Sequence, residues 1–220
     1  MDLDPVTCSR LAALAFLHDI GKANRGFRAR VDVKAPRVGH IDQLAWVFGK
    51  DARAPAVYDH LAQVLGLSRV EGWFTDAGFP LFETIFAHHG RPWERLRPSD
   101  AHAYWVAQDG DDPVRELAPM RAALDLWFAE AFLPGVPLPE APAFHHAFAG
   151  LLMLADWLGS DERFFPFADG QCPNRMAFSR PSALDALRLV GLDAVASRAA
   201  LKQRAMSFAD AFGLPTPRPT

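Results

Sequence analysis

The chain has 220 residues, of which 50% are hydrophobic and 22% charged, and its formal net charge at pH 7 is −3. This length and composition favour one domain with a sizeable core, and the charge excludes a strongly basic protein that binds any polyanion. The longest apolar run, residues 147–155, is too short to span a membrane, and the opening Met-Asp-Leu-Asp-Pro lacks the basic region of a signal peptide. With cysteines only at positions 8 and 172, neither a disulfide framework nor a thiolate zinc site is expected, and the protein should remain in the cytoplasm.

Apolar residues recur at helical spacing along nearly the whole chain, and period-two alternation is almost absent. Glycine and proline interrupt this pattern at Gly66, at Gly90 and in the segments 134–142 and 165–181. The predicted helices cover residues 7–20, 40–49, 56–65, 80–89, 100–107, 114–132, 143–160, 182–196 and 198–211. The sequence therefore predicts an all-α fold in a single globular domain.

The first predicted helix ends in an adjacent histidine and aspartate, His18 and Asp19. Leu11, Leu14 and His18 follow helical spacing, so His18 shares the apolar face, and Gly21 is expected to end the helix. His18 and Asp19 would then lie in a last turn, beside the core and near solvent. The alternative is a capped helix end with no ligand.

Further potential metal ligands occur along the chain. His88 and His89 close the helix predicted at 80–89, with Gly90 as its stop, and His40 leads the helix predicted at 40–49. Asp156 lies in a strongly apolar helix, where an unpaired carboxylate is costly and a nearby cation would remove that cost. Although each histidine could instead be a satisfied core residue, together these side chains predict a hydrolase that uses manganese, iron, cobalt or nickel.

Basic residues follow both groups of ligands. The first cluster contains Lys22, Arg25, Arg28, Arg30, Lys34 and Arg37, and the second contains Arg91, Arg95 and Arg97. Basic groups beside the ligands suggest a phosphate-bearing substrate, with Arg25, Arg28 and Arg91 as binding candidates, whereas an ordinary solvated loop is the alternative. Lys22, close after His18, is a candidate for stabilising the transition state or the substrate phosphate.

The run Ala15 to Phe27, AFLHDIGKANRGF, resembles the signature of HD-superfamily phosphohydrolases, specifically the HD nuclease domain of the type I CRISPR-associated helicase-nuclease. Three later segments support this resemblance in the family's order: Gly39-His40, Ala87 to Pro92, and Leu154 to Asp161. Residues 208–220 resemble the linker that leads to a helicase in that family. The resemblance therefore implies an HD nuclease domain at 1–207 and a linker at 208–220.

The resemblance implies a metal-dependent nuclease that degrades single-stranded DNA during CRISPR interference. Its partners would be a helicase domain, in the same or a separate chain, and a guide-RNA surveillance complex. By the family's pattern, His18, Asp19 and Asp156 would hold one divalent ion and His40, His88 and His89 the other, with Asp19 bridging both. Asp19 and Lys22 would then serve catalysis, and Ser160, in a family-like Gly-Ser-Asp stretch, is a candidate for a hydrogen bond to phosphate.

The sequence departs from the family's pattern at one point. The family supplies another metal-binding histidine upstream of the H-D motif, but no histidine precedes His18 here, so the first ion is expected to be the looser one. Two other functions stay open. The chain could be an HD phosphohydrolase of a nucleotide or cyclic dinucleotide, although Gly90-Arg91-Pro92 does not resemble the His-His-Glu and Gly-Tyr-Pro pattern of the cyclic-dinucleotide class. It could also be a metal-poor domain that binds DNA or docks to a partner.

Overall fold

The computed structural model describes residues 3–48, 54–75, 79–90, 101–167, 174–192, 194–195, 198–199 and 207–216. By its internal contacts the chain forms two compact units, Met1–Asp156 and Trp157–Thr220. Within the described residues every assigned element of secondary structure is a helix, apart from one isolated β-bridge between Gln108 and Asp111. The predicted all-α class is confirmed. The predicted division into a nuclease domain at 1–207 and a linker at 208–220 concerns the function of each part, and it stays a prediction.

The α-helices of the first unit are α1 (Pro5–Leu17), α2 (Arg25–Arg28), α3 (Asp42–Phe48), α4 (Pro55–Leu65), α5 (Leu67–Glu71), α6 (Phe79–Thr84), α7 (Ala118–Trp127) and most of α8 (Pro142–Gly159). Its 3-10 helices are η1 (Ile20–Ala23), η2 (Ala29–Val31), η3 (Ile85–Ala87), η4 (Ala101–Tyr104), η5 (Arg115–Leu117) and η6 (Ala129–Phe132). The second unit contains α9 (Arg175–Leu189) and α11 (Phe208–Phe212). Within the residues described, no helix has both the length and the apolar character to cross a membrane.

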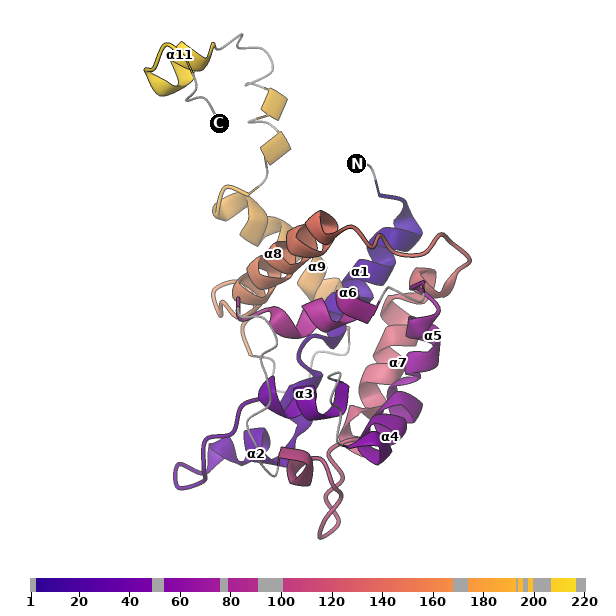
Figure 1. The fold of residues 1–220 in the computed structure, drawn as a ribbon. Helices are drawn as coiled ribbons and strands as arrows, with labels where there is room; N and C mark the ends of the chain where they lie inside the picture. The colour runs from indigo at the N-terminus through magenta and orange to yellow at the C-terminus, as the bar shows by residue number, and fades with distance from the viewer. Residues whose placement is uncertain are drawn as a thin grey trace. The chain divides into compact units, whose positions relative to one another are not determined.

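The core of the first unit surrounds α1. Leu14 and Leu17 of α1, Ile85 of η3 and Leu44 of α3 are each 0% exposed and belong to one hydrophobic cluster. Buried residues of α4, α5 and α7 belong to the same cluster, and α4 packs against α5 and α7 (Figure 1). Burial of each such side chain contributes roughly 1.5–3 kcal/mol. The cluster therefore holds together three elements that end or begin next to the predicted ligands.

A buried arginine fixes α1 to the segment that follows α7. Arg10 is 4% exposed, and its guanidinium donates hydrogen bonds to the carbonyls of Ala131, Leu133 and Val136 at 3.0, 3.0 and 2.6 Å. These acceptors satisfy a charge that burial alone would make costly. α1 is thereby held near its middle by Arg10 and at its C-terminal end by the core near Leu17.

The first helix is shorter than predicted, and Gly21 has a different role. α1 ends at Leu17, and Gly21 lies within η1 rather than at a left-handed helix stop. Its environment explains the glycine, because a Cβ added there would lie 2.1 Å from the carbonyl oxygen of His40. Gly90, with φ of 74°, does adopt the left-handed conformation predicted for a stop.

Other predicted boundaries were wrong where a proline or a cap changes the local geometry. Residues 114–132 form η5, α7 and η6 in place of one helix, and a proline that can donate no N–H bond occupies the first turn of α7. α9 begins at Arg175, not 182, because Asn174 caps it, and the helix continues through Pro181. The helix predicted at 100–107 is the short η4. Ser207 and Asp210 form a capping box that begins α11 at Phe208, within the range predicted as one helix from 198.

Candidate metal centre

His18, Asp19, His88 and His89 lie at helix ends, as expected from the sequence. His18 is the C-cap of α1 and is followed by Asp19, while His88 is the C-cap of η3 and is followed by His89. His40 lies two residues before α3, in the segment that connects it to η2. His88 and His40 are buried, at 1% and 8% exposed, whereas His18 is partly exposed and His89 is exposed. The core therefore holds these ligands while one side of the group stays open to solvent.

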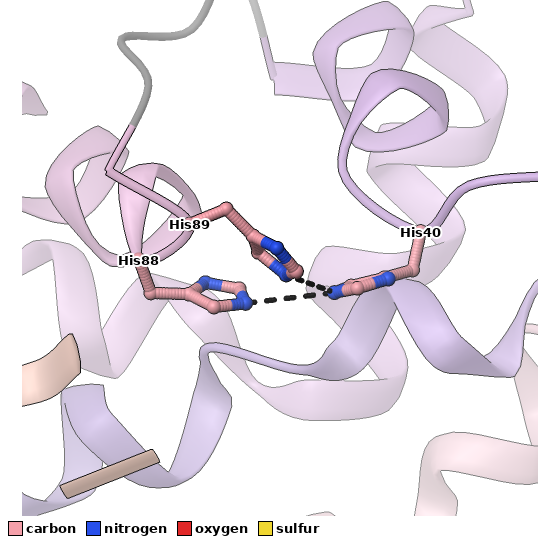
Figure 2. Close-up of side chains that lie close together, drawn as sticks. All are labelled: His40, His88 and His89. Atoms are coloured by element: carbon pink, nitrogen blue, oxygen red, sulfur yellow. Dashed lines mark hydrogen bonds between the residues drawn. The ribbon is translucent and has the colours of Figure 1, made fainter. Parts of the chain in front are cut away.

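Three imidazoles converge in one group, His40, His88 and His89. The Nε2 atom of His40 lies 3.5 Å from Nε2 of His88 and 3.2 Å from Nε2 of His89. Figure 2 shows the three rings turned toward one another, with His40 approaching from a separate segment. Nitrogens bound at ~2.0–2.1 Å to one tetrahedral ion lie roughly 3.3 Å apart, so the spacing matches that of a shared ion. His89 is exposed, which leaves the group open to solvent.

A second group combines His18, His88 and Asp156, whose ligand atoms all lie within 4.8 Å of one another. Nε2 of His18 is 3.4 Å from Oδ1 of Asp156, so the carboxylate on α8 does have a partner next to the first helix. His88 belongs to both groups, which the sequence did not indicate. Because an imidazole Nε2 has one lone pair, His88 can bind only one ion at a time.

Asp19 lies between the two groups. Its Oδ1 is 3.3 Å from Nε2 of His40 and 3.7 Å from Nε2 of His88, whereas its Oδ2 is 3.2 Å from Nε2 of His18 and also contacts the ammonium of Lys22. Oδ1 is buried and accepts no hydrogen bond in the described part of the chain. A buried carboxylate oxygen without a donor is costly. A cation at this point would compensate it.

Backbone contacts orient two of the histidines. Nδ1 of His18 lies 2.6 Å from the carbonyl of Ala15, and Nδ1 of His88 lies 2.8 Å from the carbonyl of Ile85. Since a carbonyl only accepts, each ring donates from Nδ1, and the neutral ring then has its lone pair on Nε2, the atom that faces the groups above. This second hydrogen bond is the usual support of a metal-bound histidine.

The protonation states of His88 and Asp19 also suit metal ligands. Burial lowers the pKa of His88 to about 4, so this imidazole is neutral near pH 7. Burial alone would raise the pKa of Asp19, but the imidazoles of His18 and His40 and the ammonium of Lys22 outweigh it and hold that pKa well below its usual value. Burial likewise lowers the pKa of His18, and the carboxylate of Asp19 more than reverses this effect. A neutral imidazole and an ionised carboxylate fit a divalent transition-metal ion.

The residues predicted to contact substrate differ in their surroundings. Arg25 donates hydrogen bonds to Oε1 of Gln108 and the carbonyl of Ala103, and Nη2 of Arg28 donates to both carboxylate oxygens of Asp111 at 2.6 and 2.7 Å. Both arginines thus anchor the segment 103–111 to α2. Ser160 lies just beyond α8, in the second unit, and is exposed, whereas Arg91 lies outside the described residues.

One functional candidate was missed from the sequence. Asn24 is 0% exposed; its Nδ2 donates to the carbonyls of Gly21 and Gly39 at 2.8 and 3.1 Å, and its Oδ1 accepts from the backbone N–H of Phe27 at 2.8 Å. An asparagine just before a helical segment is a typical N-cap signal, which predicts the Phe27 contact. No local signal reveals the contact with Gly39, fifteen residues later.

Comparison with known proteins identifies the family. Neither the curated proteins nor the solved structures contain a match. A family model described as "Cas3, HD domain" matches residues 3–165, and this range includes every histidine and aspartate of the two groups. The match confirms the resemblance of the H-D run and its three supporting segments. Membership of this family indicates metal binding and nuclease chemistry in a CRISPR context. The chain belongs to the Cas3 HD-domain family.

Proposed function

We propose that the chain is a nuclease that uses divalent metal to hydrolyse phosphodiester bonds of single-stranded DNA during CRISPR interference. The observation that carries this proposal is the carboxylate of Asp19, which directs one oxygen toward each histidine group and leaves the buried Oδ1 without a donor. A buried carboxylate oxygen that accepts no hydrogen bond, beside three converging imidazoles, is a costly arrangement in the absence of a cation.

Each residue would have a defined task. His40, His88 and His89 would hold one divalent ion, and His18 and Asp156 the other, with Asp19 shared between them. Bound ions would supply water activation and stabilise the charge that develops on the phosphate. Lys22, whose side chain is 46% exposed, would turn its ammonium from Asp19 to a substrate phosphate.

The substrate would approach from the side of the exposed His89 and α2. Arg25 and Arg28 would contribute positive potential there, although the pair with Asp111 offsets the charge of Arg28. Arg91 and Ser160 are further proposed contacts to phosphate. A helicase domain, in this chain or another, would supply the single strand after a guide-RNA complex opens the target, in the cytoplasm.

A digestion assay tests this function. Metal-stripped protein is incubated with labelled single-stranded DNA, with the same sequence as a duplex, and with a cyclic dinucleotide, each with manganese or with chelator. We expect cleavage of the single strand only with manganese, and loss of cleavage in His89→Ala. His146→Ala, which removes an exposed histidine of α8 outside both groups, is the matched control. Preference for the cyclic dinucleotide would support a nucleotide phosphohydrolase, and absence of cleavage with all substrates would support a metal-poor docking domain.

A further inference from the structure

The backbone around His40 is held by side chains that are not ligands. Nδ2 of Asn24 donates to the carbonyl of Gly39, the residue before His40, and also to the carbonyl of Gly21. The Cα of Gly21 in turn faces the carbonyl of His40 so closely that no Cβ would fit. Two separate contacts therefore fix the loop that carries His40 against the segment that follows Asp19.

Asn24 also acts on His40 through a neighbouring ring. Its Oδ1 accepts the backbone N–H of Phe27, and the ring of Phe27 packs edge-on against the imidazole of His40, with 5.2 Å between ring centroids and an interplanar angle of 76°. One buried amide thus holds the chain on two sides of this ligand. The three hydrogen bonds of the Asn24 side chain form a rigid connection, because each of them is buried or partly buried.

His40 depends on this support more than His18 and His88 do. The rings of His18 and His88 are each fixed by a contact between Nδ1 and a carbonyl of their own helix. Within the described residues, the polar contacts of the His40 ring all run through Nε2, toward His88, His89 and Asp19. The place of Nε2 of His40 is therefore determined by its backbone and by Phe27.

We propose that Asn24, together with Gly21, is a positioning residue that sets the place of His40 and thereby the metal affinity of the group formed by His40, His88 and His89. This inference rests on the proposed function of that group as a metal site. Loss of a hydrogen bond that orients a metal ligand directly weakens metal affinity by about 10–100-fold, and we expect an effect of this order from Asn24, which acts through the backbone beside His40.

The chemistry of the side chain separates this role from ordinary helix capping. Aspartate caps a helix about as well as asparagine, so Asn24→Asp preserves the bond from Phe27. It removes both donors, however, and places carboxylate oxygens against the carbonyls of Gly21 and Gly39. A role limited to capping predicts nearly unchanged metal binding for Asn24→Asp, whereas a positioning role predicts a loss.

The test is calorimetric titration of the metal-stripped protein with manganese, supported by the visible absorption spectrum of bound cobalt, which reports the ligands. We expect Asn24→Asp to bind manganese about 10–100-fold more weakly and to alter the cobalt spectrum. Asn174→Asp is the matched control, since Asn174 is an exposed N-cap of α9 that accepts from Ala177. Its binding should equal that of the unmodified chain.

A second variant reaches His40 by a different route and covers the case in which Asn24→Asp does not fold. Gly21→Ala should weaken binding similarly, while Gly150→Ala, where a Cβ meets nothing within 4 Å, should not. Unchanged manganese affinity and cobalt spectrum in a folded Asn24→Asp or Gly21→Ala would overturn the positioning role. If the unmodified chain itself bound no metal, the proposed function would fail first, so the two failures are distinguishable.

Discussion

Replacement of Asp19 with alanine removes the carboxylate shared by the two histidine groups. One oxygen lies 3.3 and 3.7 Å from Nε2 of His40 and His88, and the other lies 3.2 Å from Nε2 of His18, so both groups lose a candidate ligand at once. Since loss of a mere supporting contact weakens metal binding ~10–100-fold, loss of this ligand should weaken it by more than about 100-fold. Cleavage that depends on divalent metal should fall below detection.

The fold should survive this substitution, because the Asp19 side chain is 24% exposed and lies outside the hydrophobic cluster. The assay combines manganese titration, digestion of single-stranded DNA and circular dichroism, which should show helical content close to that of the unmodified chain. Asp125→Ala is the control, since it removes a carboxylate that pairs with Arg69 and Arg121 away from the centre. Turnover by Asp19→Ala at the rate of the unmodified chain would refute the mechanism.

Three further predictions concern charge, metal content and the core. Joint neutralisation of Arg25, Arg28 and Arg30 should weaken binding of single-stranded DNA and flatten its dependence on salt; an unchanged slope would leave Arg25 and Arg28 only the role of anchoring the segment 103–111. After dialysis against a mild chelator, elemental analysis should find fewer than two metal ions per chain, since the two groups share His88, and two retained ions would contradict this. Ile85→Ala, at a position 0% exposed in the core beside His88, should lower the free energy of unfolding in denaturant by ~2–5 kcal/mol, and a loss well under 1 kcal/mol would contradict the packing.

Local signals in the sequence were sufficient for part of this centre. Helical spacing indicated that His18 points toward the core at the end of a helix, and the structure places it as the C-cap of α1. The same reasoning predicts that His88 lies at the end of a helix that Gly90 stops, and the structure places His88 as the C-cap of η3 with Gly90 in the left-handed conformation. These predictions succeeded because the residues that decide them lie within two turns of one helix.

Contacts between distant segments were beyond local reasoning. The convergence of His40 with His88 was expected only from family resemblance, because spacing in sequence does not reveal which loops meet. The sequence likewise predicts Arg28 as a contact to substrate phosphate, whereas in the structure it pairs with Asp111, 83 residues later. The sequence predicts Gly21 as a helix stop, but in the structure its lack of a side chain allows the close approach of the His40 carbonyl. In each case the deciding neighbour is supplied by tertiary packing.

The most direct test of the metal centre is anomalous diffraction at the manganese edge from crystals of the chain soaked in manganese. We predict a peak at ~2.0–2.3 Å from Nε2 of His40, His88 and His89, with an oxygen of Asp19 in its coordination shell. A protein that digests single-stranded DNA with manganese but shows no anomalous peak at these side chains would contradict the account.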